Sequence, residues 1–446
     1  MDDIEKRLGK LGIAIPEILL PNATAPEKWA VIACDQFTQD RNYWSKVKEA
    51  AADAPSTLHL IFPEIYLDDA DNVMRIDNIH NAMRNCIDSG IFAKPRKGFI
   101  YLERDTPVNI CRRGLVAAID LECYDWQPSA RPLIRATEGT VPERIPPRMD
   151  IRRGAPLETP HILLLIDDED DALLRQLGER AQKSNPVYQG KLMLNSGSIK
   201  GWGLDSPEDW AFIAEGLEKL LHSGCNIHSG DTPFLFAAGD GNHSLACAKS
   251  IWEEFKAANN VTDHACRYAL VEIENIHDPA IQFEPIHRIA FGLNFNEALT
   301  LFSALPCFSY REIQNSKELL TLIAEETGQI RFGIVSENRY ALIELGPGSK
   351  PEGFTGDRQC NIAVAFVQPV LDKAGISLDY IHGEEELFRI TAKPGPEKPS
   401  CGILMPPVQK TGFFRSIAQG GPLPRKSFSM GKAEEKRFYY ECRRLF

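Results

Sequence analysis

One segment constrains the fold of this chain more than any other: a short apolar run that leads into a loop with two glycines and then into a helix. Residues 233–238 are typical of a buried strand, and the loop Gly239-Asp240-Gly241-Asn242-His243-Ser244 follows. A helix is expected over residues 244–258, because apolar residues recur on one face: Leu245, Ala248, Ile251, Trp252 and Phe255. A strand that turns directly into a helix indicates a layered protein with both sheets and helices.

The rest of the chain carries the same alternation. Strands are predicted over residues 30–34, 56–62, 99–103, 114–121, 161–166 and 268–273, and helices over 77–89, 172–182 and after Ser206-Pro207, a favourable helix start. Beyond about residue 290 the pattern predicts a helix over 296–305, a hairpin of 330–335 with 340–345, and a helix over 360–374 interrupted near Pro369. We therefore expect an α/β to α+β mixed fold, with one domain over 1–290 and a smaller α+β domain over 291–446.

Composition and charge exclude several classes of partner. The 446 residues are 43% hydrophobic and carry a net charge of −12, which argues against nucleic acid or an anionic membrane as the main partner. The eleven cysteines show no C-x-x-C spacing. The N-terminus does not resemble a signal peptide. No apolar run reaches the roughly 18 residues of a membrane span. We expect a cytoplasmic protein with reduced thiols and small-molecule partners. The sequence leaves a homodimer open.

The loop 239–244 has the residue types of an anion-binding site. Gly239 and Gly241 permit positive φ and a close approach of ligand to backbone, and the first amides of the following helix favour an anion. Asp240 is suited to hold Mg²⁺ or to accept a proton, Asn242 and Ser244 to donate to phosphate oxygens, and His243 to donate or relay a proton. The alternative is a capped strand–helix turn without a ligand. A nucleophile pair of Ser244 with His243 is a third, weaker interpretation, because adjacent residues at a helix start point in different directions.

A second candidate lies in the irregular stretch 131–160, which contains six arginines: Arg131, Arg135, Arg144, Arg148, Arg152 and Arg153. Guanidinium groups match phosphates and carboxylates with two hydrogen bonds. Glu138 and Glu143 lie among them, and a carboxylate near bound phosphates could orient or deprotonate a hydroxyl. The alternative is a solvated loop with internal Arg–Glu pairs.

Four further features carry weaker signals. Asp35 follows a buried strand, where binding groups often lie in open α/β sheets, or it forms an Asx turn. The acids at 167–171 suit a metal or, more simply, a helix start. His161 and His287 adjoin apolar segments and fit the pattern of core or edge histidines. The loop 420–427 carries two cations, which a solvated loop explains better than contact with an anionic ligand does.

These elements together resemble the family known as domain of unknown function 1015. Its Asp-Gly-His-His-Arg box is similar to Asp240-Gly241-Asn242-His243-Ser244, and its His-Glu-x-Thr box to Thr137-Glu138-Gly139-Thr140, with Arg144 downstream. Its Pro-x-His-Arg element resembles Pro285-Ile286-His287-Arg288, its Pro-x-Lys-Ser element resembles Pro424-Arg425-Lys426-Ser427, and its early Tyr-Asp turn resembles Cys34-Asp35. The order and spacing extend the resemblance from about residue 14 to the end.

The resemblance implies a ParB/sulfiredoxin-like nucleotide-binding core and a kinase of a small hydroxyl compound, with free L-serine as the leading acceptor and ATP or ADP with Mg²⁺ as cofactors. The chain departs from the family at Asn242 and Ser244, where a histidine and an arginine are usual, so a phosphate clamp is lost. The alternatives are a nucleotide-binding regulatory protein without substantial turnover and a phosphate-ester hydrolase.

These implications assign a role to each candidate residue. Catalytic roles fall to Glu138, Asp240 and His243, and the metal to Asp240. Nucleotide binding is expected from Gly239, Gly241, Asn242, Ser244, Arg135, Arg144 and Arg148, and substrate binding from Asp35, Thr140 and His287. The whole mechanism requires that Glu138 and the loop 239–244 lie close together in space.

Overall fold

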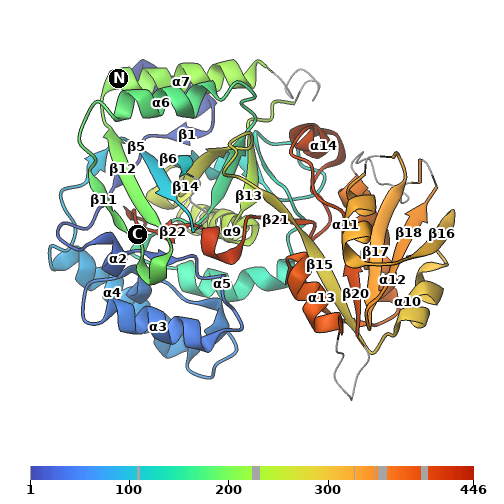
Figure 1. The fold of residues 1–446 in the computed structure, drawn as a ribbon. Helices are drawn as coiled ribbons and strands as arrows, with labels where there is room; N and C mark the ends of the chain where they lie inside the picture. Colours follow the sequence, from blue (N-terminus) through green and yellow to red (C-terminus); the bar gives the residue numbers. More distant parts are fainter. Residues whose placement is uncertain are drawn as a thin grey trace. The chain divides into compact units, whose positions relative to one another are not determined.

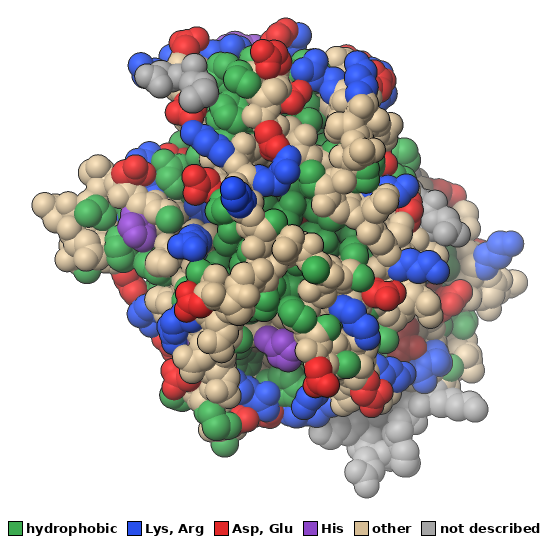
Figure 2. Space-filling model, turned by 90° about the vertical axis from the view of Figure 1, so that its left-hand side faces the viewer, with side chains coloured by type: hydrophobic (Ala, Val, Ile, Leu, Met, Phe, Trp, Pro, Cys, Tyr) green, Lys and Arg blue, Asp and Glu red, His purple; other side chains and the backbone are tan. Residues whose placement is uncertain are grey.

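The computed structural model describes residues 2–107, 111–223, 232–325, 327–346, 348–349, 359–392 and 400–446. The chain forms two compact units (Figure 1). Unit 1 comprises Met1–Ile281 together with Ala433–Phe446, and unit 2 comprises Gln282–Lys432. None of the described helices combines the length and apolar character that crossing a membrane requires. On the face shown in Figure 2, basic and acidic side chains are interspersed among hydrophobic ones.

Unit 1 is built on one large mixed sheet with the strand order β11-β12-β5-β6-β14-β10-β13-β8-β7, to which β1 adds by pairing with β6. The strands are β1 (Ile13–Ala14), β5 (Phe99–Asp105), β6 (Cys111–Asp120), β7 (Tyr124–Asp125), β8 (Ile134–Ala136), β10 (Leu163–Ile166), β11 (Tyr188–Lys191), β12 (Ser198–Leu204), β13 (Phe236–Asp240) and β14 (Tyr268–Asn275). β13 runs parallel to β8 and antiparallel to β10. The predicted mixed α/β class is confirmed.

Both faces of this sheet are covered by apolar cores. Successive side chains of a strand point to opposite faces, so Leu115 of β6 joins one core and Val116 the other. Helices α1 (Asp2–Lys10), α6 (Ala172–Ala181), α7 (Pro207–Leu221) and α9 (Asn242–Asn259) contribute to the first core, and α3 (Arg41–Ala51) and α4 (Asn72–Asp88) to the second. Two shorter helices, α2 (Pro26–Trp29) and α5 (Ile145–Arg152), complete the helices described here for unit 1.

The last residues of the chain return to unit 1. β22 (Phe438–Tyr439) pairs with β3 (Val31–Ile32), and β23 (Arg443–Arg444) pairs with β9 (Leu157–Glu158). The sequence-based division at residue 290 assigned this segment to a C-terminal domain, and the unit boundaries differ from that expectation. The physical reason is burial: the aromatic residues of the segment, Phe438, Tyr439 and Tyr440, belong to the second core of unit 1.

Unit 2 contains a second sheet with the order β16-β18-β17-β20-β15-β19, and β21 also pairs with β15. Its strands are β15 (Phe283–Phe291), β16 (Phe308–Ile313), β17 (Ile330–Ser336), β18 (Arg339–Leu345), β19 (Ser377–His382), β20 (Ser400–Leu404) and β21 (Phe428–Met430). Its helices are α10 (Phe295–Phe302), α11 (Ser316–Ala324), α12 (Gln359–Lys373), α13 (Glu384–Ala392) and α14 (Phe413–Gly420). The predicted hairpin of 330–335 with 340–345 is confirmed as the antiparallel pair β17–β18.

Three local expectations are corrected by the structure. Residues 56–62 do not form a strand, because Thr57 begins a 3-10 helix and its hydroxyl bonds the backbone around Trp29 and Val31. The stretch 131–160 is not wholly irregular, since it contains β8, β9 and α5. The helix α12 continues through Pro369 instead of breaking there. The nine cysteines whose side chains the structure describes are free.

Candidate functional site

The loop 239–244 forms where β13 ends and α9 begins. Gly241 takes the left-handed conformation, with φ of 77°, and a Cβ at this position would lie 3.1 Å from the Cα of Ile162. Only glycine meets both demands without strain. The amide of Leu245 donates to the carbonyl of Gly241 at 2.9 Å, so the helix starts directly at the loop and its first amides face outward from the turn.

The segment that contains Glu138 lies against this loop. The amide of Thr137 donates to Oδ1 of Asn242 at 3.2 Å, and the amide of Val141 donates to Nε2 of His243 at 3.3 Å. β8 and β13 are parallel neighbours, so their carboxyl ends reach the same edge of the sheet. Glu138 lies between these two anchored residues. The structure therefore brings together the two segments whose proximity the mechanism requires.

Asn242 and His243 hold the site together through these bonds. Nδ2 of Asn242 also donates to the carbonyl of Ala238 at 3.2 Å and to Oγ1 of Thr137 at 3.3 Å. The hydroxyl of Thr137 in turn donates to the carbonyl of Ala238. The two side chains that were expected to contact phosphate thus join the loop to its neighbour, and a bound anion would depend on the backbone amides at the start of α9.

Asp240 is paired with a lysine from the far end of the sequence. Nζ of Lys436 lies 3.0 Å from Oδ2 of Asp240, and the amide of Gly241 donates to Oδ1 at 3.0 Å. Burial tends to raise the pKa of Asp240, but Lys436, the Gly241 amide and the nearby His161 outweigh it, so the pKa lies below its usual value. Lys436 is 5% exposed, so a buried ammonium group stands at the loop.

The expected metal role of Asp240 does not fit this arrangement well, because each of its oxygens already accepts from a nitrogen donor. Within the described part of the chain, the group of acidic and imidazole side chains close enough to share an ion is Asp167, Glu169 and His277. That group does not include Asp240. In it, Nε2 of His277 pairs with Asp167 at 2.7 Å, while Asp168 bonds the amide of Leu173 near the start of α6.

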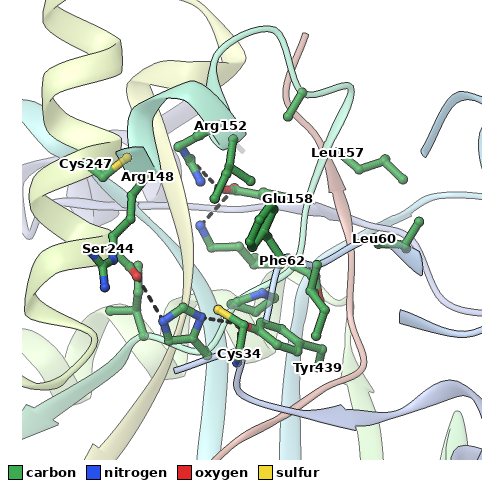
Figure 3. Close-up of a pocket in the computed structure, with 18 of the residues that line it drawn as sticks. Cys34, Leu60, Phe62, Arg148, Arg152, Leu157, Glu158, Ser244, Cys247 and Tyr439 are labelled. Carbon is green, nitrogen blue, oxygen red and sulfur yellow. Dashed lines mark hydrogen bonds and ion pairs between the residues drawn. The ribbon is translucent and has the colours of Figure 1, made fainter. Parts of the chain in front are cut away.

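A second chain of hydrogen bonds begins at Ser244. Its hydroxyl lies 2.9 Å from Nε2 of His161, and Nδ1 of His161 lies 2.6 Å from the hydroxyl of Tyr439 (Figure 3). The amide of Cys34 donates to the same tyrosine oxygen at 3.1 Å. Ser244 is therefore paired with His161 and not with His243, the partner considered in the sequence. Burial raises the pKa of the Tyr439 hydroxyl well above its usual value, so the phenol stays protonated.

Ser244, His161 and Tyr439 line a cavity of about 140 Å³ inside unit 1 (Figure 3). Much of the remaining wall is apolar and includes Leu60, Phe62, Met83, Ala155, Leu157 and Leu270. Two ion pairs also border the cavity. Arg148 pairs with Glu64, and Arg152 pairs with Glu158 at 2.6 Å.

The three arginines that were predicted to bind nucleotide lie in different environments. Arg148 lies in the cavity wall, and Arg144 is exposed just before α5. Arg135 is turned toward the other end of its strand, where it donates to the carbonyls of Pro132 and Thr232 and stacks over Phe234. This placement gives no support to a phosphate contact by Arg135.

The three predicted substrate residues belong to different elements of the fold. Asp35 follows β3 and accepts from the side chain of Gln36, and Thr140 belongs to the segment beside α9. His287 belongs to β15 of unit 2, is 2% exposed, and accepts at Nδ1 from the amide of Met405. Burial and Arg288 lower its pKa to about 3, so it is neutral. His287 therefore has the character of a core histidine.

Sequence reasoning missed four groups that the structure places at the site: Glu64, His161, Lys436 and Tyr439. His161 was noted, but only as a core or edge histidine. Lys436 and Tyr439 gave no signal, since their partners Asp240 and Cys34 are distant in the sequence. The net charge of −12 also gave no indication that a lysine would be buried at the site.

Comparisons with known proteins give one match to a family and several to solved structures. The chain is similar to a conserved hypothetical protein from Pyrococcus furiosus (11% identity, TM-score 0.35, covering 73% of this chain and 90% of that one). It is similar to a free serine kinase in complex with AMP (12% identity, TM-score 0.37, covering 73% of this chain and 90% of that one). It is also similar to C-terminally truncated SbnI from Staphylococcus aureus (9% identity, TM-score 0.34, covering 74% of this chain and 81% of that one). No curated protein matches the sequence.

The family match covers most of the chain and agrees with the boxes recognised in the sequence. It extends from residue 18 to residue 373 and so includes both loops of the site. The chain belongs to the family described as protein of unknown function (DUF1015).

Proposed function

We propose that this protein is a phosphotransferase that moves the γ-phosphoryl group of ATP to the hydroxyl of a small molecule. The observation that carries the proposal is the direct bonding of the 137–141 segment to the start of α9. This contact puts a carboxylate, Glu138, beside a glycine loop and a helix N-terminus. Phosphoryl transfer depends on this combination of positioning and charge stabilisation.

Each group in the site has a role in the proposed reaction. The backbone amides at the start of α9, from Asn242 to Ser244, hold the nucleotide phosphates, and Lys436 neutralises charge that develops on them. Glu138 orients the acceptor hydroxyl and takes its proton. The acceptor oxygen then bonds to the γ-phosphorus while the bond from that phosphorus to the bridging oxygen breaks, and ADP leaves.

Mg²⁺ and the specific fold are further parts of the proposal. The ion would arrive with the nucleotide and be held mainly by phosphate oxygens, because the carboxylate of Asp240 is paired with Lys436. We assign the nucleotide-binding part of unit 1 to the ParB/sulfiredoxin-like group on the basis of the family resemblance. The free cysteines and the use of ATP fit a cytoplasmic setting. Free L-serine is the acceptor that the family resemblance favours.

A second candidate is nucleotide binding without turnover. One observation favours it: the side chains of Asn242, His243 and Asp240 are all engaged within the protein. A loop closed in this way can hold phosphates through its backbone and still lack a free side chain for chemistry.

The test is turnover of ATP with Mg²⁺, with and without L-serine, with O-phosphoserine read by mass spectrometry. Serine-dependent product that is lost in Asp240→Ala would support the kinase with this acceptor. Product formed at the wild-type rate by Glu138→Gln would remove Glu138 from its role. Protection of the fold by ATP without product from any hydroxyl compound in a panel would favour the second candidate.

A further inference from the structure

The ion pairs at the cavity in unit 1 contain more positive than negative charge (Figure 3). Arg148 in the wall pairs with Glu64, and the charges of these two side chains cancel. Arg152 in the wall pairs with Glu158 at 2.6 Å, but Glu158 also pairs with Arg443. Three guanidinium groups thus share two carboxylates, and one positive charge is in excess.

The excess charge falls on Arg152. One oxygen of Glu158 accepts from Nη2 of Arg152, and the other accepts from Nε of Arg443 at 2.7 Å. That second oxygen also accepts from the amide of Leu270 at 3.0 Å, so both oxygens of the carboxylate are engaged. Nε of Arg152 is buried and has no hydrogen-bond partner. A buried donor without an acceptor is costly, and a carboxylate is the acceptor whose geometry matches a guanidinium group.

Much of the remaining wall suits hydrocarbon. A water molecule needs about 10–15 Å³ of such space, so a cavity of about 140 Å³ has room for a body several times larger than a water. Apolar atoms that leave water for this wall gain free energy in proportion to the area that is buried. A molecule with a carboxylate at one end and a compact apolar body would therefore satisfy both parts of the cavity. The ammonium group of a free amino acid would instead add positive charge where positive charge is already in excess.

The cavity is distinct from the place proposed for the acceptor hydroxyl, because Glu138 is not part of its wall. We propose that the cavity is a second ligand site, which binds a small monocarboxylic acid with an apolar body and bonds its carboxylate to Arg152. A dicarboxylate would exceed the single excess charge, and a neutral amide would leave that charge unmatched. Ser244 lines the cavity and lies in the first turn of α9, so the bound acid would adjoin the loop 239–244. The inference does not depend on the proposed kinase activity.

The first experiment titrates the full-length protein with benzoate by isothermal titration calorimetry. Benzamide is the matched neutral molecule, since it has nearly the same shape without the charge, and 3-methylbutanoate with its amide forms a second pair of different shape. We expect each acid to bind at least tenfold more tightly than its amide. Equal affinities within both pairs, or no binding of either acid, would overturn the proposal.

The second experiment removes the excess charge. Arg152→Met deletes the guanidinium group and keeps an unbranched side chain, and we expect it to weaken benzoate binding at least tenfold while benzamide binding changes little. Arg153→Met is the matched control, because Arg153 is exposed, pairs with Asp150 and Glu254, and does not line the cavity. It should leave both affinities unchanged. The same loss of benzoate binding in the two variants would show that Arg152 is not the group that holds the carboxylate.

A third variant guards against loss of folding, because it predicts a gain. Glu64→Gln removes a negative charge from the wall, while its amide oxygen can still accept from Arg148. The excess positive charge then rises from one to two, and we expect benzoate to bind at least threefold more tightly, a result that unfolding cannot imitate. Unchanged or weaker benzoate binding in this variant would contradict the charge argument. The expected pattern is the same whether or not the protein turns over ATP.

Discussion

The two units are stabilised in different ways. Unit 1 buries a network of ionisable groups: Arg104, Arg112, Glu272, Glu274, Arg437 and Glu441 are each at most 1% exposed. Among the described residues of unit 2, the buried charged side chains are Arg288 and Arg331, and the sheet is antiparallel throughout its described pairs. Buried charges cost desolvation energy and help stability little. Their concentration in unit 1 indicates that this unit maintains a defined polar architecture around the candidate site, whereas unit 2 depends on apolar packing.

The largest effect that would test this comparison is expected at Arg437. Its guanidinium pairs with Glu272 and Glu441, both fully buried. Arg437→Ala leaves two buried carboxylates without the guanidinium that pairs with them, and we expect a loss of about 3–5 kcal/mol in the free energy of unfolding, measured by denaturant titration.

Arg331 in unit 2 provides the matched control. It pairs with Glu344 at 2.7 Å and Glu325 at 3.0 Å, but these carboxylates keep some access to water and can be rehydrated. Arg331→Ala should cost clearly less than Arg437→Ala. Equal losses would show that the two units do not differ in the way described.

The next effect concerns activity. If Glu138 takes the acceptor proton, Glu138→Gln should lower kcat about 100-fold, because general base catalysis contributes on that order. His287→Asn in unit 2 should leave kcat almost unchanged, since His287 is buried and bonded to the backbone of Met405. A steady-state assay with saturating nucleotide makes the comparison. A large loss of kcat in His287→Asn would indicate that unit 2 takes part in the reaction.

A smaller effect is expected from two glycines with the same backbone conformation. Gly241 in unit 1 and Gly292 in unit 2 have φ of 77° and 76°, but a Cβ would meet Ile162 only at Gly241 and open space at Gly292. Gly292→Ala should cost about 1–2 kcal/mol, the price of the left-handed conformation. Gly241→Ala should cost more, because the neighbouring backbone must also move. Equal decreases in melting temperature for the two variants would show that the backbone around Gly241 moves easily to make room for the added Cβ.

The last effect is a pH dependence of stability, which is expected from Glu274. Burial raises its pKa to about 8, against the opposing influence of Arg112, and the nearby Glu272 adds to the increase. A carboxyl whose pKa is raised on folding stabilises the protein most at low pH, and this contribution is lost as the pH rises through about 8. Glu274→Gln should therefore flatten the decline in stability between about pH 5 and pH 9. An unchanged slope in denaturant titrations would assign the decline to other groups.

Much of the local structure could be predicted from sequence patterns. The Ser206-Pro207 helix start, the β17–β18 hairpin and the strand–loop–helix at 236–259 all appear as expected, since short-range capping, turn and periodicity rules govern them. The segment 56–62 shows the limit of this approach. Its apolar pattern resembles a strand, but the hydroxyls of Ser56 and Thr57 bond the backbone near Trp29 and favour a 3-10 turn.

For the candidate site, the sequence by itself determined the chemistry that is present: two glycines at a helix start, and a glutamate among arginines. Only the tertiary structure decided which groups meet. The parallel pairing of β8 with β13 brings Glu138 to the loop, and the return of residues 433–446 to unit 1 brings Lys436 to Asp240 and Tyr439 to His161. Local rules act over a few residues, whereas these contacts depend on strand order and on burial of the chain's last aromatic residues, which are properties of the whole fold.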